Sequence, residues 1–215
     1  MTRLAVAAAL AAVGLQPPDA SGVQRTATLD NAAVAVTRVR LAAGTRDEVH
    51  TSSPVVIVQL STGDIAVVDR EMRRLGNRPG EVWYLPANGR QATISSGSAP
   101  ADIVTIALKP GRAPAAAAPA AEAPPGIVRA TLVDNADVRV VRVRFQPNGR
   151  EPLHTHPNDL VTVQVTSGSV EIVNGNERTT SVRPPGFVQF VPRGVSHAYA
   201  SADTNAFEIL SVAIK

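Results

Sequence analysis

The sequence predicts an all-β protein made of two copies of one domain of roughly 90 residues. Of its 215 residues, 44% are hydrophobic but only 3% are aromatic, so Val, Ile, Leu and Ala must form most of the interior. β-Branched side chains favour strands. Short Val-rich runs recur at roughly ten-residue spacing, and no segment in the copies keeps a helical period over three turns, which indicates a sandwich or a barrel. The expected strands include residues 138–145, 160–166, 170–173, 187–191 and 207–214.

The two copies follow from an internal repeat. The segment RTATLDN at 25–31 resembles RATLVDN at 129–135, and VTRVR at 36–40 resembles VVRVR at 140–144, at a shift of 104 residues. One inserted residue makes the shift 105, and a second makes it 106. The anchors aligned at these later shifts are Gly44 with Gly149, Gln59 with Gln164, Gly63 with Gly168, Gly80 with Gly186, and Pro86 with Pro192. Their common order predicts a tandem duplication.

Two segments lie outside the copies. Residues 110–126 read PGRAPAAAAPAAEAPPG, where prolines break regular structure and alanines offer little to bury, so we expect a linker between domains at 22–109 and 127–215. At the start, Arg3 precedes an uncharged apolar stretch from Leu4 to Leu15, which suits a signal-peptide core and is shorter than the ~20 residues that span a bilayer. We therefore expect a signal peptide at 1–20, a periplasmic or secreted mature protein, and no integral membrane segment in it. A buried or frayed N-terminal helix is the alternative.

Composition excludes several classes of site. The sequence has no cysteine, which rules out disulfides, thiolate metal sites and a cysteine nucleophile. Its net charge of +3 comes from 21 basic and 18 acidic residues. The densest basic run contains Arg70, Arg73, Arg74 and Arg78 together with Asp69 and Glu71, and it has no aromatic residue for stacking bases. We interpret it as a solvated hairpin tip, with an anion-binding patch as the alternative, and expect no nucleic-acid partner.

Three of the four histidines lie in the second copy. His154 and His156 flank Thr155, so in an extended strand both side chains leave the same face. His197 lies beside the turn Pro192–Gly194 and is the obvious third donor. Imidazole ligands suit Zn, Fe, Cu or Ni, whereas Mn usually needs a carboxylate as well. The pattern predicts a divalent transition metal held by the second copy.

The same residues resemble the two motifs of the cupins. Gly149, His154, His156 and Gly168 resemble the first motif, G(X)5HXH(X)3,4E(X)6G, with one residue fewer before His154. Gly186, Pro192, Gly194 and His197 match the second, G(X)5PXG(X)2H(X)3N, with Ser201 in place of Asn. The resemblance implies a bicupin, with two small jelly-roll β-barrels in tandem and a metal held by His154, His156 and His197 in the second.

The family's glutamate ligand is missing, because its position is Val161. We consider Asp159 as a substitute ligand, with a role in the turn after Pro157 as the alternative. In the first copy the positions equivalent to the ligands are Val49, Thr51, Val56 and Gln91, which offer no usual ligand set. His50 is one residue out of register, so we expect it on the surface. We therefore expect that the first barrel has lost its metal. Its remaining role would be to pack against the second barrel, to form a homodimer, or to close the mouth of the second barrel.

Neighbouring residues suggest the kind of ligand. Tyr199 shares the strand face of His197, Phe190 precedes the Pro192 turn, and Val161, Val163 and Val165 are expected to form an apolar wall. We expect these residues to line a pocket for a small, partly apolar molecule. The predicted function is a metal-binding bicupin of the cell envelope that acts as a mononuclear metal oxygenase or isomerase. The alternatives are a non-catalytic protein that binds a metal or small ligand, and a purely structural pair of metal-free barrels.

Overall fold

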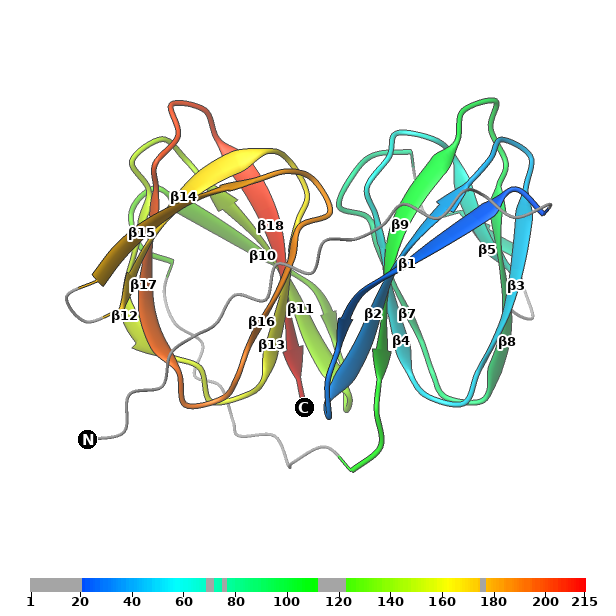
Figure 1. The fold of residues 1–215 in the computed structure, drawn as a ribbon, viewed down its shortest axis with the longest axis horizontal. Coiled ribbons are helices and arrows are strands. Elements are labelled where there is room, and N and C mark those ends of the chain that lie inside the picture. Colours follow the sequence, from blue (N-terminus) through cyan, green and yellow to red (C-terminus); the bar gives the residue numbers. More distant parts are fainter. Residues whose placement is uncertain (1–20, 69–71, 75–76, 112–122, 175–176) are drawn as a thin grey trace.

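The computed structural model describes residues 21–68, 72–74, 77–111, 123–174 and 177–215, and every regular element in these ranges is a β-strand (Figure 1). The N-terminal unit contains β1 (Val23–Asp30), β2 (Val34–Leu41), β3 (Arg46–Thr51), β4 (Val55–Gln59), β5 (Ile65–Val68), β6 (Met72–Arg74), β7 (Val82–Leu85), β8 (Gly89–Ser95) and β9 (Ala101–Leu108). The C-terminal unit contains β10 (Ile127–Asp134), β11 (Val138–Phe145), β12 (Arg150–Thr155), β13 (Leu160–Gln164), β14 (Gly168–Asn174), β15 (Glu177–Arg183), β16 (Val188–Val191), β17 (Ser196–Ser201) and β18 (Phe207–Ile214). The part of the chain described here has no helix that is both long and apolar enough to cross a membrane.

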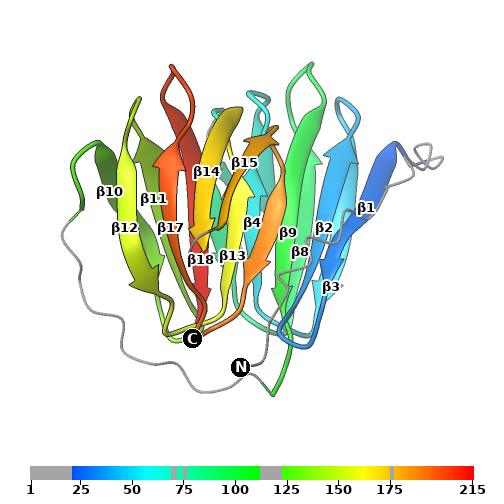
Figure 2. The same cartoon turned by 60° about the vertical axis from the view of Figure 1, so that its left-hand side comes forward.

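Each unit is a jelly-roll barrel made of a five-stranded and a four-stranded antiparallel sheet. The orders are β1-β2-β9-β4-β7 with β3-β8-β5-β6, and β10-β11-β18-β13-β16 with β12-β17-β14-β15. The second pair of orders repeats the first strand for strand. Figure 2 shows that the strands of both barrels run close to one common direction. This confirms the all-β fold of two tandem barrels. The expected signal peptide and most of the expected linker, residues 112–122, lie outside the described residues.

The strand registers correct one detail of the repeat. Strands β1 and β10 carry equivalent bulges, at Thr28 and Leu132. Strand β12 has an additional irregularity between Glu151 and His154 that β3 lacks, so the inserted residue lies there and not before Gly149. The counterpart of Gly44 is therefore Asn148. Both adopt a left-handed backbone, with φ of 74° and 61°, and Asn tolerates this region better than most other residues.

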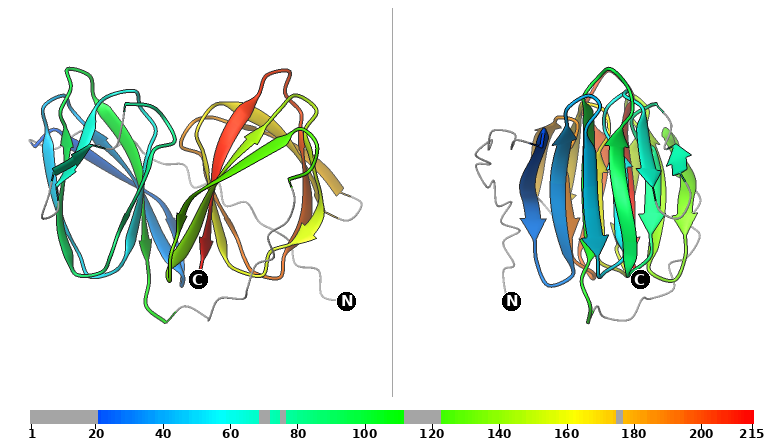
Figure 3. Two further views of the ribbon diagram at one scale, coloured as in Figure 1. Left: turned by 180° about the vertical axis from the view of Figure 1, so that it is seen from behind. Right: turned by 90° about the vertical axis from the view of Figure 1, so that its right-hand side faces the viewer.

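The largest apolar cluster lies between the barrels. The two five-stranded sheets face each other (Figure 3). Alternation along them directs one set of side chains into each barrel and the other set towards the neighbouring barrel. Fully buried members of the shared cluster include Val34, Val36, Val56, Val58, Val104 and Ile106 from the first barrel, and Val138, Val140, Val161, Val163, Leu210 and Val212 from the second. The barrels thus form one unit, as expected if the first serves in packing.

Two glycines let the barrels approach closely. Gly80 and Gly186 both have positive φ, 85° and 81°. A Cβ on Gly186 would lie 2.9 Å from Arg38 Nη1, and one on Gly80 would lie 3.1 Å from Arg142 Nη2. Arg142 also donates a 2.8 Å hydrogen bond to the Gly80 carbonyl. The Arg38–Gly186 and Arg142–Gly80 contacts involve equivalent positions of the repeat and join the barrels as a pseudo-symmetric pair. A hydrogen bond from Tyr84 to Asp137 also joins them.

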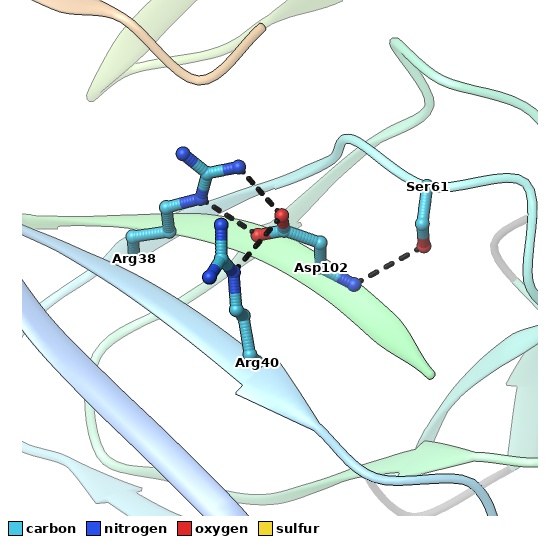
Figure 4. A network of polar contacts seen from close by, with 4 residues as sticks. All are labelled: Arg38, Arg40, Ser61 and Asp102. Atoms are coloured by element: carbon cyan, nitrogen blue, oxygen red, sulfur yellow. Dashed lines mark hydrogen bonds and ion pairs between the residues drawn. The ribbon is translucent and has the colours of Figure 1, made fainter. Parts of the chain in front are cut away.

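A groove at this junction is lined in part by Arg38, Arg40 and Gly186. Both arginines bind the same carboxylate, that of Asp102. Arg38 makes hydrogen bonds of 2.9 and 2.6 Å to the two oxygens of Asp102, and Arg40 makes one of 3.4 Å (Figure 4). The Asp102 backbone N–H donates to Ser61 Oγ at 3.1 Å. The groove is therefore a structural feature of the junction, with one carboxylate shared between two guanidinium groups.

Candidate metal centre

Two neighbouring strands of the C-terminal barrel bring the three histidines together. Strand β12 pairs with β17 so that His154 lies directly opposite His197. His156 follows β12 and is held against the Pro192–Gly194 turn by two backbone hydrogen bonds, from its own N–H to Val195 and from the Gly194 N–H to its carbonyl. Gly194 has a φ of 77°, which the turn requires and which glycine adopts without strain. Local backbone geometry therefore places all three imidazoles.

The ring nitrogens converge on one point. The His156 Nε2 atom lies 3.1 Å from the Nε2 of His154 and 3.1 Å from the Nε2 of His197. The Nδ1 of His154 lies 2.8 Å from the Pro152 carbonyl oxygen, which can only accept, so Nδ1 carries the proton and Nε2 keeps a free lone pair. Such an outer hydrogen bond is the usual way in which a metal-binding histidine is oriented.

The spacing fits a single ion. Nitrogens bound to one ion at about 2.0–2.1 Å are about 2.8–3.4 Å apart when the bonds make angles between 90° and tetrahedral. The 3.1 Å separations fall in this interval, and the three residues form a group whose ligand atoms all lie within 4.8 Å of one another. The donor set present therefore fits a divalent transition metal.

Burial keeps two of the rings neutral. It lowers the pKa of His156 to about 4, with smaller contributions from the charges of His154 and Arg129. It lowers the pKa of His197 to about 3, with contributions from His156, His154 and Arg183. A neutral imidazole is the form that binds a metal, so the site is preorganised for ligation at neutral pH.

Asp159 is not part of the group, which corrects its assignment as a substitute ligand. Its Oδ1 accepts a 2.9 Å hydrogen bond from the Arg193 N–H, so it holds the turn that carries the second motif. Among the described residues, the metal-binding group contains three histidines and no carboxylate. On β13, the residue that faces the barrel next to Val161 is Leu160, which is 6% exposed and cannot bind a metal.

Val161 and Phe190 also lie elsewhere than expected. Val161, Val163 and Val165 belong to the cluster between the barrels, and Phe190 packs against it. Val161 and Phe190 are direct cross-strand partners, so they share that outer face. The prediction that they line the ligand pocket is wrong, because they lie on the outer face of the sheet, which the neighbouring barrel buries.

Tyr199 does lie beside the histidines. Its ring centroid is 4.4 Å from that of His197, and its hydroxyl donates a 3.1 Å hydrogen bond to Gln189 Oε1. The sequence interpretation missed Gln189 and Arg183, which share this face of the barrel; Arg183 donates to the same Gln189 oxygen at 2.8 Å. The polar alternation of Thr162 and Gln164 with Val161 and Val163 was the available signal that the inner face is polar.

In the N-terminal barrel the equivalent backbone pair is Val49 opposite Gln91. His50 pairs with Arg90, one position away, in agreement with the predicted register. The prediction that the His50 side chain is on the surface lies outside the described residues. Within the described part of this barrel there is no metal-binding group.

Comparison with known proteins supports the fold. Residues 141–213 match the model of the cupin domain family. The chain resembles the structure of AerE from Microcystis aeruginosa, with a TM-score of 0.75 and 11% identity over 94% of this chain and 97% of that one. It also resembles oxalate decarboxylase from Bacillus subtilis (TM-score 0.67, 10% identity, 94% and 75% covered) and salicylate 1,2-dioxygenase from Pseudoaminobacter salicylatoxidans (0.64, 12%, 84% and 71%). No curated protein matches the sequence.

Proposed function

Since residues 141–213 match the cupin domain family and the whole chain has the two-barrel fold of the structures named above, we propose that it is a mononuclear metalloenzyme of the cell envelope. Its C-terminal barrel would hold one divalent transition metal through His154, His156 and His197 and act on a small molecule. The reaction class we favour is oxygenation or isomerisation. The N-terminal barrel contributes no ligand and supports the site by packing.

The observation that carries this proposal is the convergence of three imidazole nitrogens, with that of His156 3.1 Å from each of the other two and no carboxylate in the group. Three protein ligands leave coordination positions for substrate, as catalytic metal sites do and closed structural sites do not. A bound metal would supply Lewis acidity and, if it is Fe, Mn or Cu, electron transfer.

The chain's own residues define the other tasks. The Pro152 carbonyl orients His154, and Tyr199 and Gln189 present polar groups on the same side of the barrel. Two of the structural neighbours named above are a dioxygenase and a decarboxylase, and the decarboxylase structure is described with Mn(II) centres. These names support metal-dependent chemistry on a small molecule.

The missing carboxylate favours a second candidate function. Leu160 and Val161 occupy the positions where the family motif has its glutamate, and the resulting neutral donor set suits a protein that retains a metal or ligand without turnover. The two candidate functions share the metal site. They differ in whether the protein converts the bound molecule into a product or releases it unaltered. The predicted segment 1–20 supports a location in the envelope for both, and cell fractionation of the native chain tests it.

To test the enzyme, the untagged protein is stripped with a chelator, reloaded with Fe²⁺, Mn²⁺, Zn²⁺, Cu²⁺ or Ni²⁺, and incubated with small phenols, carboxylates and sugars. Products and oxygen uptake are then measured. We expect turnover with one metal, and its loss in His156→Ala but not in Val182→Ala, whose side chain is 78% exposed. Retention of an unchanged ligand with no product under every metal would favour the binding protein.

A further inference from the structure

One buried arginine in the C-terminal barrel has no role in the site described so far. Arg183 is the last residue of β15 and is 3% exposed, and no other lysine or arginine is buried among the described residues. Several less buried arginines on this barrel have acidic partners: Arg129 pairs with Glu151, Arg144 with Glu208, and Arg178 with Glu171. No carboxylate pairs with Arg183 within the described part of the chain.

Its surroundings are neutral and partly aromatic. One terminal nitrogen donates to Gln189 Oε1 at 2.8 Å, while Nε is buried without a hydrogen-bond partner. The guanidinium carbon lies 5.0 Å from the centre of the Phe187 ring and 5.5 Å from that of Tyr199. Aromatic faces stabilise a cation, but they do not replace an anion. A buried guanidinium with one neutral acceptor retains a strong tendency to bind an anion.

Arg183 lies close to the histidines. Tyr199 contacts both, since its ring is also 4.4 Å from that of His197. The charge of Arg183 is one of the causes of the lowered pKa of His197, after burial and the other two histidines. The unpaired cation and the histidine group therefore belong to one side of the barrel interior.

The repeat shows that this cation is not a requirement of the fold. At the shift of 106 residues, Arg183 corresponds to Asn77, which is exposed, and Gln189 corresponds to Trp83. The N-terminal barrel forms the same sheets, and none of its arginines whose side chains the structure describes is buried. The buried cation and the histidine group thus occur together in one barrel and are both missing from the described part of the other.

We propose that Arg183 is the anion-binding residue of the C-terminal barrel and that the ligand is a small carboxylate with an unsaturated or aromatic body. Its carboxylate would bind Arg183, and its other end would face the histidines. The planar fork of a guanidinium matches a carboxylate, and Phe187 and Tyr199 suit a flat apolar body. This inference rests on the proposed function for the role of the histidines but not for binding itself.

Isothermal titration of the full chain with benzoate, benzamide and inorganic phosphate tests the proposal, in the metal-free and the Co²⁺-loaded protein. We expect benzoate to bind, benzamide to bind at least tenfold more weakly, and Arg183→Gln to weaken benzoate at least tenfold while Co²⁺ content stays unchanged. In Arg183→Lys part of the affinity should remain. Arg178→Gln, on the same strand but with a 67% exposed side chain, is the matched control and should bind benzoate as the native protein does.

A second variant keeps the test decisive if Arg183→Gln folds poorly. Gln189→Glu adds an internal carboxylate beside the guanidinium, so it should abolish benzoate binding while the thermal midpoint stays the same or rises. Equal affinity for benzoate and benzamide, full affinity in Arg183→Gln or Gln189→Glu, no benzoate binding to the native protein, or a preference for phosphate would each overturn the proposal. Failure to take up Co²⁺ would contradict the proposed function alone, because titration of the metal-free protein still tests Arg183.

Discussion

In the N-terminal barrel, Ile57 on β4 lies opposite Trp83 on β7, and both pack into the barrel interior. At the equivalent positions of the C-terminal barrel, Thr162 lies opposite Gln189. The next interior position, at the shift of 106 residues, is Thr93 in one barrel and Tyr199 in the other. One backbone plan therefore encloses an apolar core in the first barrel and a polar site in the second.

The outer faces do not differ in this way. Val56 and Val58 of β4 correspond to Val161 and Val163 of β13, and all four are fully buried between the barrels. An apolar outer face is required in both barrels because each covers the other. The comparison teaches that the shared interface and the apolar first barrel provide the stability that allows a polar interior in the second.

The largest expected effect breaks the shared interface. Val161→Asp would place a charge in a fully buried apolar cluster and should destabilise the protein by roughly 4 kcal/mol or more. We expect loss of soluble folded protein, measured by expression yield and near-ultraviolet circular dichroism. Val182→Asp, on a side chain that is 78% exposed, is the control and should behave as the native chain; a well-folded Val161→Asp would contradict the assignment of this face.

A smaller effect is expected from making the first barrel resemble the second. Trp83→Gln removes apolar contacts from the N-terminal core and should lower the free energy of unfolding by about 2–3 kcal/mol, below the full cost of a completely buried Trp because this side chain is only partly buried. Urea unfolding measures the change. Metal content should not alter, and a loss of metal in this variant would show that the barrels are not separate in function.

The metal-free protein should lose stability on acidification. Because the pKa values of His156 and His197 are lowered to about 4 and about 3, the unfolded chain binds more protons than the folded one between these values and the ordinary pKa of about 6.5. Stability is therefore complete above pH 6.5 and declines as pH falls towards 4. Thermal unfolding of chelator-treated protein from pH 7.5 to 4.5 should show this decline, with a shallower slope in the double variant His156→Asn, His197→Asn.

The smallest effect concerns Asp159. Asp159→Ala removes one partly exposed hydrogen bond to the Arg193 N–H, which should cost about 1 kcal/mol in stability. Metal affinity should stay within a few-fold of the native value, since the carboxylate lies outside the histidine group. Loss of bound metal in this variant would restore Asp159 as a ligand.

Sequence patterns predicted the strands, the duplication and the three converging histidines, because period-two alternation and motif spacing are local properties. They did not predict which face of β13 is inside the barrel. Its residues are buried on both faces, and although Thr162 and Gln164 alternate with the valines, this alternation alone does not show that the apolar face meets another barrel. The position of Asn148 was missed for a similar reason, since a bulge in β12 shifts the register without a recognisable residue.

Arg183 and Gln189 could not be found from sequence, because their role depends on contacts between strands distant in the chain. An arginine at the end of a strand normally reaches solvent, and only packing against Phe187 and Tyr199 shows that this one is buried. Asp159 shows the opposite case. It is close in sequence to the histidines, but the turn that it caps directs it away from them.

The most direct test of the account is elemental analysis of the untagged chain after reconstitution, carried out beside His156→Ala and His197→Ala. The account predicts one metal ion per chain in the native protein and none in either histidine variant, with unchanged circular dichroism in both. Two ions per chain, or one ion retained in both variants, would contradict a single site made by the histidines of the C-terminal barrel.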